Sequence, residues 1–524
     1  MSLAYPRLPP ELFTVQAVRR LETEFIKAGT PGAELMRRAA DSALEALLER
    51  WPQTKRLSVF VGAGNNAGDG YCLANLAHQR GLFVQLVCVG DPETLTGDAA
   101  DAAAAAFELG IAQTTELPIS RIHEVWVDAL LGIGLSREVE GDFLRTIEWL
   151  NLCKAPILAL DCPSGLCSDT GSERGKAVRA DLTVTFIALK RGLLTGQGPS
   201  CVGDLLLDDL GLPPAILAKA PAEVWRYDWH SHFSLPAREA SSHKGSHGHV
   251  VIIGGDYGFG GAALLAAEAA LHCGAGLVSV ITRSANRSGM LARCPELMVL
   301  GTEDDESAVS RIDALLERAT AVVVGPGLGR GQWGSALWRR LRASLRADSK
   351  VLVDADALYF LADEEQKTKS SKQQWVLTPH PGEAAMMLGE SVATVQADRF
   401  ASVQALHKRY KASALLKGAG SLLCIEQDHQ FMQKHHVRNL LCTEGNPGMA
   451  TGGMGDVLAG TVGALMAQGL SGPFGLEFGV ALHGEAGDLA AQRCGERGLR
   501  ASDLMPELRR LLNPLEAPGS APEL

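Results

Sequence analysis

Short apolar runs alternate with helical stretches along most of this chain of 524 residues, and no other feature limits its fold as strongly. Strands that alternate with helices form mostly parallel sheets covered by helices on both faces. The rhythm pauses at 212–235, so we predict an α/β protein with a domain at 1–211, a linker at 212–235 and a domain at 236–524. The expected strands are 57–62, 84–89, 125–131, 157–161, 182–188, 250–254, 277–282, 321–325, 350–354, 375–378 and 414–417, and helices are expected at 455–469, 475–494 and 501–512.

Charge and composition narrow the classes of function. A net charge of -11 and a pI near 5.7 argue against a nucleic-acid partner, which needs a basic face. Eleven cysteines without a C-x-x-C pair argue against a disulfide framework and indicate reduced thiols, hence the cytoplasm. No apolar run reaches the ~20 residues of a membrane span, and the first residues lack an apolar signal region. We therefore expect neither export nor membrane insertion.

A glycine-dense loop at 445–456 ends in one carboxylate, Asp456, directly before an apolar helix expected from about Val457. Glycines at 452, 453 and 455 permit positive φ and let backbone N–H groups approach an anion, to which the helix adds its positive end. Beside phosphates, Asp456 is suited to take a proton from a hydroxyl. The structural alternative, in which Asp456 is only a helix N-cap, stays open at this point.

The N-terminal half carries polar residues where predicted strands end. Asn65, Asn66 and Asp69 follow a strand and a glycine turn, and Asp128 and the segment 161–165 follow two later strands. Ligands of doubly wound sheets bind where such strand ends meet. Asn66, Asp128 and Ser164 offer hard oxygen ligands for a monovalent or other hard cation, with no thiolate or imidazole set that would indicate zinc. A structural alternative, in which the asparagines only satisfy the turn, stays open.

Three motifs of this half, N-N-x-G-D-G, D-x-L-x-G-x-G and D-x-P-S-G, resemble the NAD(P)H-hydrate epimerase domain over about 10–211. The resemblance implies a Rossmann-like doubly wound domain that interconverts the two epimers at the hydrated ring carbon, with Asp161 as acid/base. It implies potassium at Asn66, Asp128 and Ser164. It implies a substrate site made of Asn65, Asn66, Ala67, Gly68, Asp69, Gly132, Ile133, Gly134, Leu135, Ser136, Arg137, Glu138 and Asp161.

Four loops of the C-terminal half attract attention. A glycine loop at 254–262 follows a strand and offers N–H groups to a dinucleotide, and a second glycine run lies at 325–329. Two prolines fix the backbone around His380, and Lys417 begins a K-G-A-G-S segment suited to a polyphosphate. A satisfied loop histidine and a solvent lysine at a strand bend remain the structural alternatives. The three histidines at 243–249 are better explained as a loop entering a sheet than as a metal site.

The motifs H-K-G-x-x-G-H, G-P-G-L-G, D-A-D-A-L, T-P-H-P-G-E, K-G-A-G and G-N-x-G-M-A-x-G-G-M-G-D resemble the ADP-dependent NAD(P)H-hydrate dehydratase, a ribokinase-like α/β/α domain, over about 236–513. The resemblance implies that the hydrate lies on Ala262, Gly327, His380 and Asp456, with Ala263 and Gly329 one register step away. It implies that ADP lies on Lys417, Gly418, Ala419, Gly420, Ser421 and Gly455.

Together the two halves imply a bifunctional enzyme of metabolite repair, an isomerase joined to a lyase. Phosphorylation turns the poor leaving group of a hydrated nicotinamide into a good one, and elimination of phosphate restores the ring. We expect ADP as co-substrate, potassium and magnesium as candidate cations, small-molecule substrates, no nucleic acid or membrane partner, and a homo-oligomer. The alternative function is a ribokinase-like small-molecule kinase fused to a non-catalytic nucleotide-binding module.

Overall fold

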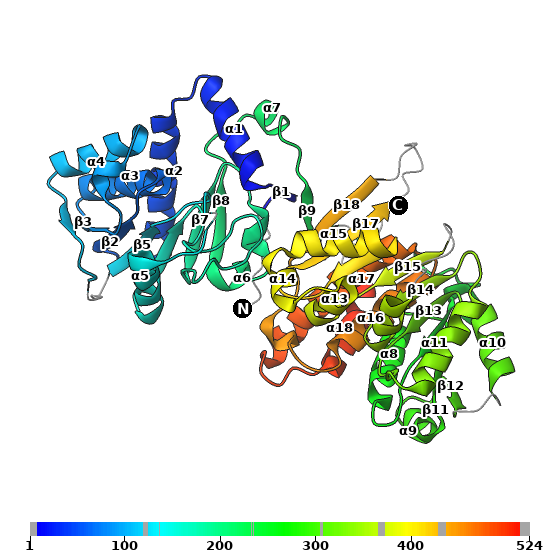
Figure 1. Ribbon diagram of the computed structural model, residues 1–524. Coiled ribbons are helices and arrows are strands. Elements are labelled where there is room, and N and C mark those ends of the chain that lie inside the picture. The colour runs from blue at the N-terminus through cyan, green and yellow to red at the C-terminus, as the bar shows by residue number, and fades with distance from the viewer. Residues whose placement is uncertain are drawn as a thin grey trace, which may run out of the picture. The chain divides into compact units, whose positions relative to one another are not determined.

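The computed structural model describes residues 8–118, 124–135, 137–231, 233, 235–303, 308–364, 373–427 and 436–513. The chain divides between Arg226 and Tyr227 into two compact units, each built on its own sheet (Figure 1). The α/β class predicted from the sequence is confirmed in both units. In the described ranges, no helix combines the length and apolar character that crossing a membrane requires.

The N-terminal unit contains a seven-stranded sheet in the order β4-β3-β2-β5-β6-β7-β8, in which every neighbouring pair is parallel. The chain moves outward from β2 to β3 and β4 and then returns to the other side of β2 with β5. The carboxyl ends of β2 and β5 therefore form the switch point where ligands bind in such sheets. The strands are β2 (Arg56–Val61), β3 (Phe83–Cys88), β4 (Ala112–Thr114), β5 (Glu124–Ala129), β6 (Ile157–Leu160), β7 (Leu182–Phe186) and β8 (Asp204–Asp208).

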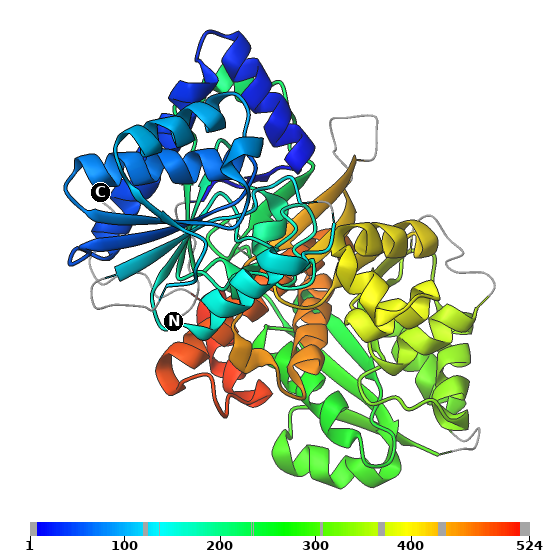
Figure 2. The ribbon, with the colours of Figure 1, turned by 60° about the vertical axis from the view of Figure 1, so that its left-hand side comes forward.

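Helices cover both faces of this sheet, because side chains of successive strand residues point to opposite faces. Leu57, Val59 and Val61 of β2 belong to a core shared with the first four long helices, whereas Phe60 belongs to a second core with Trp126 and the fifth helix. The twist of the sheet beneath the blue helices is visible in Figure 2. The helices are α1 (Val15–Lys27), α2 (Gly32–Arg50), α3 (Asn65–Gln79), α4 (Asp98–Glu108), α5 (Gly141–Leu152), α6 (Gly198–Cys201) and α7 (Pro214–Leu217).

The stretch after β8 packs into the same unit. Leu212, Ile216 and Ala220 are buried in the core that contains α1 and α2. Strand β9 (Val224–Tyr227) pairs antiparallel with β1 (Glu11–Leu12) in the register Glu11 to Trp225. The first part of 212–235, expected as a linker, is thus folded against the N-terminal unit.

The C-terminal unit carries its strands in the order β18-β17-β16-β15-β14-β13-β10-β11-β12. The pairs among β10 to β16 are all parallel, whereas β17 pairs antiparallel with both β16 and β18. The order reverses between β10 and β13, which makes their carboxyl ends a second switch point. The strands are β10 (His249–Ile253), β11 (Leu277–Arg283), β12 (Met298–Thr302), β13 (Ala321–Val324), β14 (Lys350–Val353), β15 (Gln374–Leu377), β16 (Ser413–Leu416), β17 (Ser421–Gln427) and β18 (His436–Cys442).

One helix, α16, is buried on almost every side, as its uniformly apolar sequence predicts. It packs on β10, β13 and β14 and against α8 and α17, where Gly460 permits close contact with the backbone of Ala266. The other helices are α8 (Gly260–His272), α9 (Arg287–Arg293), α10 (Val309–Arg318), α11 (Gln332–Ser344), α12 (Asp356–Asp363), α13 (Pro381–Leu388), α14 (Val392–Ala397), α15 (Arg399–Tyr410), α16 itself (Met454–Ala467), α17 (Gly472–Cys494) and α18 (Met505–Leu512).

All strands and C-terminal helices expected from the sequence are present, and seven described strands were not foreseen: β4, β8 and β12, the pair β1 and β9, and the pair β17 and β18. The first three are short or partly exposed, so they lack the continuous apolar run of a buried parallel strand. The last two form an antiparallel pair after the K-G-A-G turn.

Candidate active sites

The predicted cation ligands of the N-terminal unit lie together at the switch point. Asp128 ends β5 and is fully buried, and its Oδ1 and Oδ2 accept hydrogen bonds from Ser164 Oγ at 2.6 Å and Ser164 N at 2.8 Å. Burial raises the pKa of Asp128 to about 6, although the hydrogen bonds from Ser164 oppose the shift. Both carboxylate oxygens therefore lie in a polar cluster with little water.

Asn66, the third predicted cation ligand, lies beside Gly132 of the loop after β5. Its side chain is 6% exposed and packs over Gly132, yet neither Nδ2 nor Oδ1 has a hydrogen-bond partner among the described residues. A buried amide without partners costs free energy unless something else binds it. The simple turn role considered for Asn66 leaves this amide unexplained, whereas a cation or polar ligand would satisfy its oxygen.

Asp161 lies at the end of β6 and forms the centre of the second N-terminal cluster. Its Oδ1 accepts hydrogen bonds from Thr185 Oγ1 at 3.2 Å and from Phe186 N at 3.1 Å, and it forms an ion pair with Lys190. Lys190 is only 1% exposed and also donates to the carbonyl of Phe186 at 2.7 Å. Asp161 and Ile187 have φ of +63° and +68°. Such backbone is costly for a β-branched residue, and it concentrates at functional sites.

The charge of Asp161 also affects the pKa values of two other carboxyl groups. Burial raises the pKa of Asp69 well above its usual range, with further contributions from Asp161 and Glu22, and Lys190 opposes the shift. Burial and Asp161 also raise the pKa of Glu22, which lies on α1. The site thus contains one carboxylate paired with lysine and two carboxyl groups whose pKa values are raised.

The other predicted substrate residues of this unit occupy two segments. Asn65 to Asp69 form the first turn of α3, but Ala67 is buried in the core and Gly68 is pressed against Met36 and Ala99, so both would reach a ligand only through their backbone. Residues 132–135, 137 and 138 belong to the loop after β5, in which Gly134 approaches Arg19 of α1. Within that loop, the predicted residue Ser136 lies outside the described residues.

In the C-terminal unit, Lys417 at the end of β16 brings three carboxyl groups together. Its Nζ lies 2.9 Å from Asp354 Oδ1 and 3.8 Å from Glu383 Oε2. Burial lowers the pKa of Lys417, but the charges of Asp354 and Glu383 outweigh burial, so the net shift is upward. Burial also raises the pKa of Asp456 to about 7, Asp354 adds to the shift and Lys417 opposes it.

The glycine loop ends as predicted at the start of an apolar helix, but two details differ. Helix α16 begins at Met454 with Gly453 as N-cap, so Asp456 is its third residue and the N-cap alternative is wrong. Of the three glycines expected to take positive φ, only Gly453 does so, at +91°. Gly455 serves another purpose, because a Cβ there would lie 3.3 Å from Lys417 Nζ. The missing side chain lets the lysine approach the helix N-terminus.

His380 is the N-cap of α13, and its Nδ1 accepts hydrogen bonds from Gly382 N at 3.0 Å and Glu383 N at 3.3 Å. Its side chain is 56% exposed, and Nε2 lies 3.4 Å from Glu383 Oε1. The imidazole is therefore held by its own helix and presents its edge beside the lysine cluster. The backbone N–H of Lys417 donates to the carbonyl of Pro379 at 3.0 Å, which ties the two segments together.

Ala262 and Gly327 lie side by side at the second switch point. A Cβ at Gly327 would lie 3.2 Å from the Cβ of Ala262 and 2.5 Å from the carbonyl of Phe259, and Gly327 has φ of +60°. Ala262 is partly exposed, whereas its neighbour Ala263 is fully buried. Accessibility therefore favours Ala262 over Ala263 as the residue that contacts a ligand. Gly329 instead packs against Asp256.

The predicted nucleotide segment 417–421 forms the turn between β16 and β17. Gly418 and Gly420 have φ of +140° and +59°, so this turn needs glycine at both positions. Gly418 packs against the guanidinium of the buried Arg399, which donates to the carbonyls of Leu416 and Lys417 at 3.3 Å. Ser421 Oγ donates to the carbonyl of Gly418 at 3.0 Å.

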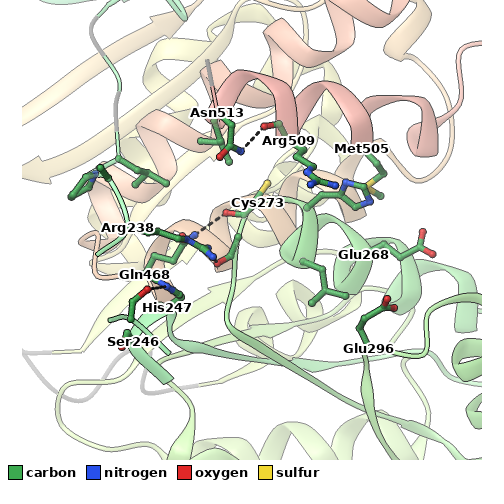
Figure 3. A pocket seen from close by; sticks show the side chains of 18 of the residues that line it. Arg238, Ser246, His247, Glu268, Cys273, Glu296, Gln468, Met505, Arg509 and Asn513 are labelled. Atoms are coloured by element: carbon green, nitrogen blue, oxygen red, sulfur yellow. Dashed lines mark hydrogen bonds between the residues drawn. The ribbon is translucent and has the colours of Figure 1, made fainter. Parts of the chain in front are cut away.

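Two cavities of the C-terminal unit lie outside these clusters. The larger, of about 1550 Å³, is lined by Arg238, His247, Glu268, Gln468 and Arg509 among others (Figure 3). It lies near the amino end of β10 and the C-terminal ends of α8 and α16, and no predicted site residue lines it. The smaller, of about 740 Å³, is lined by Asn446, Asp488 and residues at the C-terminal end of α17 and directly after it. His243, His247 and His249 make separate contacts, with Gly245, Ser242 and Ser279, as expected of a loop.

The sequence interpretation missed several members of both clusters: Glu22, Lys190, Asp354, Glu383 and Arg399. Asp354 and Glu383 stood inside the D-A-D-A-L and T-P-H-P-G-E motifs, one at the end of a predicted strand and one in the segment after another, and that position was an available signal. Lys190 followed a predicted strand in the same way. Glu22 belongs to an ordinary amphipathic helix, so its place in the site depends on tertiary packing.

Comparisons with known proteins agree with this geometry. The family profile described as NAD(P)H-hydrate dehydratase matches residues 250–510, and that of the YjeF-related protein N-terminus matches 32–192. The chain is 44% identical to the bifunctional NAD(P)H-hydrate repair enzyme of Coxiella burnetii over 506 residues, covering 96% of this chain and 99% of that protein. It is 40% identical to the Escherichia coli enzyme of the same name, over 97% of this chain and 95% of that protein.

Among solved structures, the ADP/ATP-dependent NAD(P)H-hydrate dehydratase of Bacillus subtilis, crystallised with ATP and Mg²⁺, is 25% identical, with a TM-score of 0.45 over 53% of this chain and 93% of that one. The near-complete coverage by the two curated relatives decides the assignment. The family matches also confirm the expected order of an epimerase domain followed by a dehydratase domain. The chain belongs to the family of bifunctional NAD(P)H-hydrate repair enzymes.

Proposed function

We propose that each unit carries one complete repair reaction, at the two clusters described above. The N-terminal unit epimerises the hydrates of NADH and NADPH around Asp161. The C-terminal unit dehydrates the S epimer with ADP around Asp456 and releases AMP and phosphate. The observation that carries the proposal is the Asp456 carboxyl group at the N-terminus of α16, close enough to Lys417 to feel its charge and with a pKa near 7.

Dehydration begins with the hydroxyl group on the saturated ring carbon. Asp456 takes the proton of this hydroxyl group. At the same time the hydroxyl oxygen attacks the β-phosphorus of ADP, and AMP departs. The N–H groups of 452–455 and the ammonium of Lys417 stabilise the charge on the transferring phosphoryl group. The C–O bond then breaks, the electron pair of the ring nitrogen moves into the ring, and a neighbouring carbon loses a proton. NAD(P)H and phosphate result.

The remaining assignments of this unit follow the same geometry. Lys417, Gly418, Ala419, Gly420, Ser421 and Gly455 bind ADP, and the positive φ values of two of these glycines support close contact of the backbone with phosphates. Ala262, Gly327 and His380 bind the hydrate. Magnesium remains a candidate cation beside the nucleotide, where it would neutralise phosphate charge.

Epimerisation requires loss and return of the ring hydroxyl on opposite faces. Asp161 is the acid/base of this reaction, and Lys190 orients its carboxylate. The residues from Asn65 to Asp69 and from Gly132 to Glu138 bind the hydrated dinucleotide at the switch point.

Asn66, Asp128 and Ser164 would hold potassium. Their donors are all oxygen, and the buried Asn66 amide without partners supports the fit. A bound potassium ion would supply fixed positive charge close to the substrate.

Two further expectations accompany this function. None of the eleven cysteines forms a disulfide, which supports a reducing compartment such as the cytoplasm. A homo-oligomer remains an expectation.

One assay tests the function as a whole. Purified protein is incubated with mixed hydrate epimers, with and without ADP, while the absorbance of the reduced nicotinamide is followed. With ADP, both epimers should be converted completely, and without ADP only their exchange should occur. Release of a stable phosphorylated product would instead support the kinase alternative.

A further inference from the structure

The first part of the glycine loop packs closely against helix α17. Gly484 faces Glu444, and a Cβ at position 484 would lie 2.4 Å from the Glu444 Cβ. One turn later, a Cβ at Gly487 would lie 2.4 Å from the sulfur of Met449. Two glycines on one face of a helix thus allow the segment 444–449 to lie directly against it, which any larger side chain would prevent.

Asp488 fastens this segment to the helix. It is 2% exposed, its Oδ2 accepts a hydrogen bond from Gly445 N at 3.0 Å, and its Oδ1 accepts one from Asn446 Nδ2 at 2.8 Å. Asn446 in turn accepts a hydrogen bond from Gly448 N at 3.0 Å through its Oδ1. One buried carboxylate therefore holds the start of the loop at two places, because its oxygens bind both Gly445 and the asparagine that caps Gly448.

The same helix also reaches the other end of the loop. The imidazole of His483 is buried and contacts the backbone of Met454, the first residue of α16, two positions before Asp456. Burial lowers the pKa of His483 to about 4, so the ring is neutral at physiological pH. The segment 483–488 consequently contacts the loop both at Gly445 and at Met454, and the amides of Gly452 and Gly453 lie between these two points in the chain.

We propose that Asp488 is a positioning residue for dehydration: it fixes the loop 445–455 on α17 and so sets the backbone amides and Asp456 in register with the phosphoryl group that they act on. This inference rests on the proposed function of that loop. The carboxylate acts through the loop and contacts neither ADP nor the hydrate. Its loss should therefore change the rate of the chemical step more than the binding of ADP, which is assigned chiefly to 417–421 on a different strand connection.

Kinetics of the full-length protein with ADP and the S hydrate test this inference. Asp488→Ala should lower kcat for dehydration on the order of 10- to 100-fold, the size expected when hydrogen bonds to a buried charged group are lost. KM for ADP should change less than about threefold. Asp488→Asn keeps one acceptor oxygen for one of the two bonds, so its kcat should lie between those of the wild type and Asp488→Ala.

Glu485→Gln provides the matched control. Glu485 lies on the same helix, and one of its carboxylate oxygens lies within 4.8 Å of those of Glu444 and Asp488, but it holds no hydrogen bond to the loop in the described part of the chain. This variant should keep kcat within about threefold of the wild type. Epimerisation and the melting temperature are measured in every variant, because a purely structural role would lower folded protein and both activities together.

Three results would overturn the inference. One is a kcat of Asp488→Ala equal to that of Glu485→Gln. The second is a loss of dehydration that appears only as a higher KM for ADP. The third is a proportional loss of melting temperature, epimerisation and dehydration. Asp456→Asn is assayed in parallel to separate the two levels of the argument. If it keeps dehydration, the proposed function of the loop fails, whereas inactivity of Asp456→Asn with full activity of Asp488→Ala removes the positioning role alone.

Discussion

The two units of this protein use an aspartate and a lysine in different arrangements. Each has an aspartate beside a lysine at the carboxyl edge of a parallel sheet. In the N-terminal unit, Lys190 contacts the candidate acid/base Asp161 directly. In the C-terminal unit, Lys417 forms its close ion pair with a third residue, Asp354. Within the described ranges, the Asp456 carboxylate accepts no hydrogen bond.

This difference shows how one constellation can serve two chemistries. A base that must deprotonate a hydroxyl works best with a pKa near the working pH, and the nearby Asp354 charge helps to raise that of Asp456 to about 7. The task proposed for Asp161 is different, because this residue would give a proton to the departing hydroxyl group and take one from the returning water. Lys190 fixes the orientation of the Asp161 carboxylate, and Asp69 and Glu22 nearby have raised pKa values. This arrangement suits proton exchange with the ring hydroxyl.

The largest effect should come from Asp456→Asn. The change is nearly isosteric and removes only the base, so dehydration should fall on the order of 10²–10⁴-fold. Epimerisation of the same sample should persist, which makes it the internal control for folding. Residual dehydration within a factor of about three would remove the base role and with it one side of the comparison.

In the N-terminal unit, Lys190→Met should lower the rate of epimerisation about 10- to 100-fold, because Asp161 loses the ion pair that orients it. Lys190 lowers the pKa of both Asp69 and Glu22, so these pKa values should rise in the variant and the pH profile of epimerisation should move to higher pH. The control is Lys27→Met, which replaces the exposed lysine at the end of α1. An unshifted profile with an unchanged rate would mean that Lys190 only supports the fold.

Asp354→Asn tests whether the third carboxylate tunes the base. Asp354 raises the pKa of Asp456, and its removal also frees Lys417 to pair with Asp456, so this pKa should fall below about 7. Dehydration requires ionised Asp456 and is lost as pH falls through that pKa. The acidic limb of the profile should therefore move to lower pH, and the rate at its plateau should drop about tenfold because the base is weaker.

The exposed Asp348→Asn, near the opposite end of β14, controls for loss of a negative charge. The decisive quantity is the pH midpoint of kcat. A midpoint that stays in place, or moves upward, would contradict the tuning role of Asp354.

A smaller effect is expected from the cation ligands. Asp128→Asn keeps the shape of the buried side chain but removes its charge, so epimerisation should fall about tenfold and lose its response to potassium, while dehydration of the S epimer stays intact. In the wild type the potassium response should weaken below about pH 6, where Asp128 becomes protonated. A variant that keeps both its rate and its potassium response would place the cation elsewhere.

The sequence predicted most of the fold because buried parallel strands are continuous apolar runs, and this property identified β2, β5, β10 and β13 with nearly correct bounds. It also predicted the segments that carry the two clusters, since these follow strands that meet at a switch point. It did not reveal that Lys417 pairs with Asp354, because these residues are 63 positions apart and only the sheet order brings them together. The strained backbone at Ile187 left no trace in residue type either.

The stretch 212–235 shows the same limit and gives the last and smallest prediction. Its lack of period indicated a linker, yet its first part packs on α1 and its second part joins an aromatic cluster in which Phe233 stacks on Phe478 at 5.1 Å. Irregular segments can be well packed without any periodic signal. A cut between Arg226 and Tyr227 should therefore disturb less than a cut at 211.

The fragment 1–226 should keep epimerisation within about twofold of the full chain. The fragment 1–211 loses the strand β9 that pairs with β1 and the buried side chains of Leu212 and Ile216, each worth about 1.5–3 kcal/mol of burial, so it should melt at clearly lower temperature. The fragment 227–524 should likewise dehydrate the S epimer, and 236–524 should be less stable because it lacks Trp229 and Phe233, two aromatic partners of Phe478. Equal melting temperatures for the long and short fragments would show that the packed stretch contributes nothing to either unit. Loss of both activities in the long fragments would instead show that the two reactions depend on the intact chain.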